Sequence, residues 1–92
     1  MDKFGYPDNL EMETIRTWDY NDFHGLMEYI RQMWKYADDG YWKQRGNVYR
    51  ISTGGWSGNE DIIAAMIGNT MFWMLYWRQS KRGGRYVFAK AE

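Results

Sequence analysis

The clearest hydrophobic pattern of the chain lies in residues 19–37. Apolar residues recur there at spacings of three and four positions, as on one face of a helix: Phe23, Leu26, Met27, Ile30, Trp34 and Ala37. Asp19, Asn21 and Asp22 at the start of the segment are residue types that stabilise a helix N-terminus, and Gly40 follows its end. The pattern predicts an amphipathic helix over residues 19–37.

Residues 41–53 have the pattern strand, turn, strand, and in the second strand Tyr49, Ile51 and Thr53 alternate with Val48, Arg50 and Ser52, as on a half-buried sheet. Gly46 and Asn47 lie between the two strands and suit the positive φ angles of a tight turn. Residues 85–90 alternate in the same way. We therefore expect a hairpin within residues 41–53 and a third strand at 85–90 that pairs with residues 47–53.

Two further helices are predicted between the hairpin and the last strand. Ser57 and Glu60 have the spacing of a capping box, in which each side chain accepts from the other residue's amide, so a helix is expected over residues 57–67. Gly68 ends it, and the next helix is expected over residues 70–82. The first half of this last helix is apolar all round, which requires cover from the rest of the protein or from a partner.

These elements follow the order α-β-β-α-α-β, in which a small antiparallel sheet of about three strands packs against three helices. The fold class expected is therefore α+β, with residues 1–92 as a single domain. Residues 1–17 have weak periodicity and are expected to form a loosely structured N-terminal arm that packs over the domain. The order also allows a winged-helix arrangement, against which two features weigh. The helix that would read bases is apolar, and the chain ends before a second wing strand.

Charge divides the chain into two halves, although the net charge is zero. Residues 1–40 carry nine acidic and four basic side chains, whereas residues 41–92 carry eight basic and three acidic ones. Such a division can provide a basic binding face, or it can hold the two halves together by mutual attraction. We favour the second, structural interpretation for so short a chain.

Residues suited to catalysis are few. The chain has no cysteine, and its one histidine, His24, falls on the polar side of the predicted helix 19–37. Disulfides, thiolate metal sites and cysteine nucleophiles are therefore excluded. The glycine-rich segment 52–60 could hold an anion at a helix N-terminus, but Glu60 and Asp61 would repel a phosphate there, so a structural turn is favoured. We expect no enzyme activity, no metal site and no cofactor.

The longest uncharged stretch is too short for a membrane helix. It runs from Ile62 to Trp77 and is interrupted by Gly68, whereas a helix that spans a bilayer needs about 20 apolar residues. We expect no membrane segment.

The chain is rich in aromatic residues, with six Trp, eight Tyr and four Phe. Helix 70–82 is more apolar than one small sheet can cover, and Trp, Tyr and Met are enriched at protein interfaces. We therefore expect Trp73, Tyr76 and Trp77 to contact a protein partner or a second copy of the chain. Binding of another protein is the leading hypothesis for the function.

Basic and aromatic residues are mixed in segment 77–86, as in surfaces that bind nucleic acid by charge and stacking. The alternative hypothesis is therefore nucleic-acid binding by the side chains of this segment: Arg78, Lys81, Arg82, Arg85 and Tyr86. Cations in the last turn of a helix also stabilise the helix dipole without any ligand, so a purely structural role stays open.

Three segments of the C-terminal half form a composite pattern: STGGWSGNE at Ser52–Glu60, Phe72 and Trp73 with Trp77, and RGGRY at Arg82–Tyr86. This pattern resembles one that recurs in small proteins encoded by bacteriophages. The resemblance implies a phage or prophage origin and a location in the bacterial cytoplasm. It further implies an accessory role in host takeover, counter-defence or nucleic-acid management, and it implies no catalytic residue.

Overall fold

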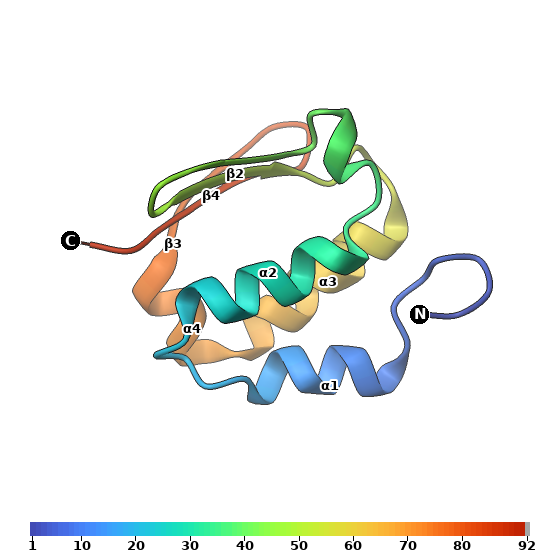
Figure 1. Cartoon of the computed structure of the whole chain (residues 1–92), viewed down its shortest axis with the longest axis horizontal. Helices are drawn as coiled ribbons and strands as arrows, with labels where there is room; N and C mark the ends of the chain where they lie inside the picture. The colour runs from blue at the N-terminus through green and yellow to red at the C-terminus, as the bar shows by residue number, and fades with distance from the viewer. Residues whose placement is uncertain (92) are drawn as a thin grey trace.

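The computed structural model describes residues 1–91, which form an α+β fold of four α-helices, one short 3-10 helix and four strands. The elements are α1 (Asn9–Thr17), α2 (Phe23–Met33), η1 (Ala37–Asp39), β1 (Trp42–Arg45), β2 (Val48–Ser52), α3 (Ser57–Gly68), α4 (Thr70–Tyr76), β3 (Trp77–Lys81) and β4 (Arg85–Ala89). The sheet is antiparallel with the strand order β1-β2-β4-β3. Figure 1 shows the sheet on one side of α2 and α3, and α1 on the other side.

The predicted amphipathic helix is confirmed as α2, although it is shorter than the expected range 19–37. Asp22 is its N-cap, because its carboxylate accepts from the Gly25 amide at 3.1 Å. The apolar face of α2 is buried along its length: Phe23, Leu26, Met27, Ile30 and Met33. The helix ends before Trp34, and Tyr36 then takes a left-handed conformation with φ 65°, which breaks any helical continuation.

The predicted hairpin is confirmed as β1 and β2. Its two-residue turn places Arg45 opposite Val48 and so fixes the register of the whole strand pair. The last predicted strand is β4, which pairs with β2 as expected. Phe88 and Tyr49 lie opposite each other in this pair, and both are buried in the core.

The helix predicted over residues 70–82 is wrong beyond Tyr76. α4 ends there, and Trp77 takes an extended conformation with φ −66° and ψ 132° that begins β3. β3 pairs with β4 across a short turn in which Gly83 and Gly84 have φ values of 86° and 73°. Because glycine adopts positive φ without strain, the chain folds back into a hairpin here. The observed order is therefore α-α-β-β-α-α-β-β, with a fourth strand and a fourth helix.

The additional helix is α1, which occupies much of the expected loose arm 1–17. It begins with a capping box, in which the Glu11 amide donates to Asp8 at 2.8 Å and the Asp8 amide donates to Glu11 at 3.0 Å. The Glu11 amide is also the main reason that the pKa of Asp8 lies below its usual value. Ile15 is fully buried and anchors the helix to the core.

The capping box predicted at Ser57 and Glu60 does not form. α3 begins at Ser57 itself, and its N-cap residue Trp56 makes no side-chain cap bond. The Ser57 hydroxyl instead donates to the hydroxyl of Tyr6 at 3.5 Å. The first turn is fixed by Asn59, whose buried side chain binds backbone groups outside α3.

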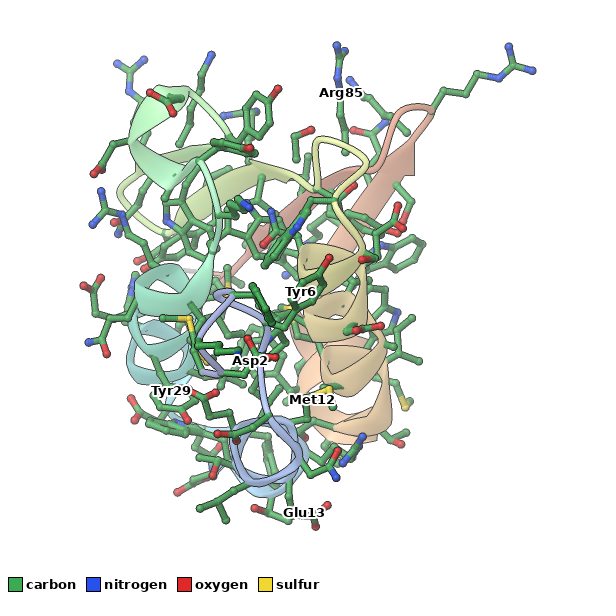
Figure 2. The ribbon with its side chains drawn as sticks, turned by 90° about the vertical axis from the view of Figure 1, so that its right-hand side faces the viewer. Asp2, Tyr6, Met12, Glu13, Tyr29 and Arg85 are labelled. Atoms are coloured by element: carbon green, nitrogen blue, oxygen red, sulfur yellow. The ribbon has the colours of Figure 1, made fainter. Side chains whose placement is uncertain are left out.

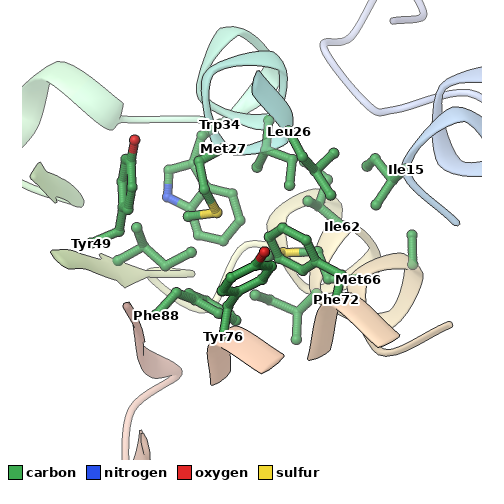
Figure 3. Packing of buried hydrophobic residues seen from close by; sticks show 14 of the residues in the cluster. Ile15, Leu26, Met27, Trp34, Tyr49, Ile62, Met66, Phe72, Tyr76 and Phe88 are labelled. Atoms are coloured by element: carbon green, nitrogen blue, oxygen red, sulfur yellow. The ribbon is translucent and has the colours of Figure 1, made fainter. Parts of the chain in front are cut away.

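One apolar core lies between the sheet and the helices. It is built largely from rings and long aliphatic side chains, and Figure 3 shows Met27, Phe72 and Phe88 converging there from α2, α4 and β4. Within residues 1–91, no helix combines the length and hydropathy that crossing a bilayer would require.

Candidate functional site

The sheet has one face against the helices and one face free of them. Directly opposite residues of paired strands share a face, so the register sorts the side chains. The inner positions hold core residues such as Tyr49 and Phe88. The outer positions form two rows across the sheet, which are Tyr41, Ser52, Arg85 and Lys81 in the first and Lys43, Arg50, Val87 and Gln79 in the second.

The two rows line an open groove of about 590 Å³, which we call the basic groove. Each strand contributes one exposed cation to it, namely Lys43 from β1, Arg50 from β2, Lys81 from β3 and Arg85 from β4. Of the described residues, none that lines the groove is acidic. Figure 2 shows Arg85 at one end of the molecule and Glu13 of α1 at the other. The outer face of the sheet is therefore strongly cationic.

Two cross-strand pairs in the basic groove place like charges directly opposite each other. Lys43 lies opposite Arg50, and Lys81 lies opposite Arg85. Like charges directly opposite each other destabilise a sheet. For comparison, a favourable cross-strand pair stabilises it by about 0.2–1 kcal/mol. Natural sequences break such rules of stability mainly at functional sites. The four cations of these two pairs are chemically suited to hold an anion.

Within residues 1–91, no ion pair joins the two charged halves, so the predicted attraction between them involves no direct contact. The ion pairs there all lie within residues 1–40 and join the N-terminal amine to Asp8 and Glu11, Arg16 to Glu13, and Arg31 to Asp38. Within the described part of the chain, no ion pair involves a cation of the basic groove. The positive charge of the sheet therefore faces solvent.

The structure brings together two of the five residues predicted to bind nucleic acid. Lys81 and Arg85 lie opposite each other in the basic groove. Three other residues that line the groove were not predicted from the sequence. They are Lys43 on β1, Arg50 on β2 and Tyr41, which directly precedes β1. The tight turn of the first hairpin was a usable signal for Lys43 and Arg50, since it places these two residues opposite each other.

The other three predicted residues have different surroundings. Arg78 stands at an irregularity in β3 and donates to the Leu75 carbonyl at 2.7 Å, which caps the end of α4. Arg82 is exposed in the turn before β4 and does not line the basic groove. Tyr86 borders the groove, but its ring packs on the helix side of the sheet against Trp73, with centroids 6.2 Å apart.

The residues predicted to contact a protein partner differ in exposure: Tyr76 is buried, Trp73 is half-buried and Trp77 is exposed. Tyr76 is only 7% exposed and lies against Phe23 and Phe72 in the core, as Figure 3 shows for Phe72. It is therefore a core residue and not a contact for a partner. Trp73 is half-buried and stacks on Trp77 at 5.9 Å, and of these two Trp77 is the more exposed.

The exposed apolar surface of α4 consists of other side chains. Met71, Met74 and Leu75 follow spacings of three and four and so share one helix face. They are 45%, 71% and 43% exposed, respectively. We call these three residues the apolar row.

His24 connects α2 to the first hairpin. Its two ring nitrogens lie 2.6 Å from the Tyr49 hydroxyl and 2.8 Å from the side-chain oxygen of Asn47. Burial, with a further contribution from Glu28, raises the pKa of the Tyr49 hydroxyl. Over residues 1–91, no cluster of three or more His, Asp or Glu side chains is arranged to hold a metal ion. The contacts of His24 give it a structural role.

Comparisons of the chain with protein-family models, with curated proteins and with solved structures find no match. The basic groove and the apolar row are therefore the two surfaces from which a function can be inferred.

Proposed function

We propose that this protein binds nucleic acid through the basic groove. The observation that carries the proposal is the presence of four exposed cations, one from each strand, in a groove to which residues 1–91 contribute no carboxylate. Contacts between phosphates and Lys or Arg supply essentially all of the affinity in sequence-independent binding of nucleic acid. A phosphate backbone in the groove would also relieve the opposed like charges of the two cross-strand pairs.

The order of elements bears on which surface would bind the nucleic acid. The sequence pattern predicts no second wing strand, which weighs against a winged-helix arrangement. In the structure, β3 pairs with β4 and provides that strand. The apolar character of α4 still weighs against a winged-helix mode of binding. A recognition helix needs polar groups that reach base edges, whereas α4 exposes the apolar row. The sheet, and not α4, is therefore the surface that we assign to the nucleic acid.

The proposal is tested by fluorescence anisotropy with labelled oligonucleotides at about 50 and 200 mM salt. We expect binding that weakens steeply with salt. Arg50→Gln and Lys81→Gln should each lower the slope of log K against log salt by about 0.7–0.9. Arg16→Gln is the matched control, because Arg16 pairs with Glu13 on α1, outside the groove. A lack of binding at the lower salt concentration, or an equal loss in the control, would refute the proposal.

Binding of a protein is a second candidate function, favoured by the apolar row. Contiguous exposed apolar side chains mark interaction sites on many proteins. In this role the chain would be a non-catalytic accessory protein, and we assign the row to a second copy. The bacteriophage origin, the cytoplasmic location and the role in host takeover or counter-defence stay predictions.

Light scattering over a range of concentrations tests self-association. The mass of the wild-type protein should rise with concentration, and Met74→Asp should keep it at that of a monomer. Leu10→Asp is the control, because Leu10 is 77% exposed on α1 and lies outside the apolar row. A wild-type protein that stays monomeric throughout would count against this role.

A further inference from the structure

We infer that the basic groove takes a single strand of nucleic acid and stacks one of its bases on Tyr41. This inference rests on the nucleic-acid binding proposed above and deepens it by naming the form of the ligand. It follows from the position of one aromatic ring, from the distribution of charge along the groove and from the apolar surface of α4.

Tyr41 stands at the end of the first row of outer side chains. The Ser52 amide donates to its carbonyl at 2.9 Å, which continues the ladder between β1 and β2 by one residue. Tyr41 is half-buried, because part of its side chain packs against the core while the residue also lines the groove. It is thus an aromatic ring in the same groove as the four cations.

The Tyr41 ring is held in place before any ligand arrives. One side lies so close to Gly54 that a Cβ atom at Gly54 would collide with the ring. Tyr36 packs edge-on against it, with ring centroids 5.7 Å apart and an interplanar angle of 75°. A ring that is already ordered loses little conformational freedom when a base stacks on it. Gly54 has φ +62°, a conformation that also favours glycine.

Charge along the groove separates a place for a base from places for phosphates. The Tyr41 end adjoins η1, which carries Asp38 and Asp39. Asp38 is engaged by Arg31 at 3.0 Å, while Asp39 is exposed. Asp39 is only two residues from Tyr41 in the chain, so its charge makes this end of the groove less favourable for a phosphate than the far end, whereas a neutral base is little affected. The far end of the same row holds Arg85 and, opposite it on β3, Lys81. The positive charge of these two side chains attracts phosphate.

A duplex fits this surface poorly. The bases of a duplex are stacked on each other and paired, so they cannot stack on an aromatic side chain, whereas the bases of a single strand are free to do so. Proteins that read a duplex usually insert a helix or a hairpin with polar side chains into the major groove. α4 exposes the apolar row instead of such polar side chains. A cationic groove combined with a stacking platform is typical of single-strand binding.

The experiment compares four labelled probes in the anisotropy assay at about 50 mM salt. These are single-stranded DNA, single-stranded RNA, a blunt DNA duplex and a blunt RNA duplex, each about 15 nucleotides long, within the usual site sizes. We expect at least one single strand to bind about tenfold more tightly than its duplex. Tyr41→Ala should weaken single-strand binding by about 5- to 150-fold, which is the effect of losing one stacked base. The salt slope should not change, because no phosphate contact is lost.

Tyr41→Phe is the matched control and should bind like the wild type, since it keeps the ring. Tyr41→Leu keeps apolar bulk against Gly54 and should lose affinity as Tyr41→Ala does, which separates stacking from folding. Circular dichroism checks that each variant is folded. Duplex binding that equals single-strand binding, or full single-strand affinity in Tyr41→Leu, would overturn the inference while nucleic-acid binding stands. If none of the four probes binds, the proposed function fails as well.

Discussion

Two buried asparagines, Asn59 and Asn69, hold parts of the backbone that apolar packing does not fix. The side chain of Asn59 accepts from the Lys35 amide at 3.0 Å and donates to the carbonyls of Lys35 and Thr53. Asn69 caps α4 through the Phe72 amide and donates to two carbonyls at the end of α1. Each asparagine thus joins segments that are distant in the sequence.

Replacement of Asn59 by Ala should lower the free energy of unfolding by about 1–3 kcal/mol. The substitution leaves the amide and carbonyl of Lys35 without their partner in a largely buried place, and unpaired buried groups carry a cost of this size. Urea denaturation followed by tryptophan fluorescence measures the change. Asn21→Ala is the control, because Asn21 is exposed, and it should change stability much less. Equal stability of the two variants would contradict the role given to Asn59.

At the scale of elements, those with one buried face could be predicted from the sequence. One side of α2, β2 and β4 packs on the core. Apolar residues therefore recur every three or four positions in α2 and at alternate positions in the two strands. β3 could not be predicted, because all five of its residues are exposed at the edge of the sheet and leave no alternation. The apolar run of α4 also continues into Trp77, which hides the end of the helix. The capping box at Asp8 and Glu11 was a readable signal for α1.

The candidate site could be predicted only in part. Lys81 and Arg85 are only four residues apart in the chain, so their proximity could be predicted. The turn at Gly46 and Asn47 likewise places Lys43 opposite Arg50. The gathering of these cations on one face, however, depends on the register between β2 and β4. That register brings together segments more than thirty residues apart, and no local pattern encodes it.

The turn between β3 and β4 should tolerate substitution at Gly83 better than at Gly84. Both have positive φ, so alanine is strained at either position, by roughly 1–2 kcal/mol. A Cβ atom at Gly84 would in addition collide with the Thr53 hydroxyl, whereas nothing lies near that of Gly83. Thermal unfolding should therefore show a larger fall in Tm for Gly84→Ala than for Gly83→Ala. Equal falls would mean that the turn does not press against Thr53 in solution.

At the scale of the whole molecule, charge is separated and not paired. Acidic side chains gather with α1 and α2, cations gather on the outer sheet, and the ion pairs of residues 1–91 stay within the first forty residues. The repulsion between opposed cations therefore opposes folding when no ligand is bound. Proteins often have less than their maximal stability at surfaces that serve function, so this charge pattern agrees with the binding that we propose for the basic groove.

Lys43→Gln should therefore stabilise the free protein at low salt, by about 0.2–1 kcal/mol, because it removes one of the opposed like charges. Urea denaturation at about 50 and 500 mM sodium chloride checks this, and the gain should shrink at the higher concentration as screening increases. Arg16→Gln removes a cation that is paired with Glu13 and should give no gain. A loss of stability in Lys43→Gln would show that the repulsion between Lys43 and Arg50 is negligible.

The outer edge of β3 also affects how separate molecules behave toward one another. A free sheet edge is a template on which another chain can add its own strand and begin a fibre. Here that edge is irregular between Trp77 and Gln79, and Arg78 and Lys81 place positive charge along it. Irregular, charged edges resist such growth, so the hairpin that contributes cations to the groove also protects crowded copies of the protein from amyloid-like assembly.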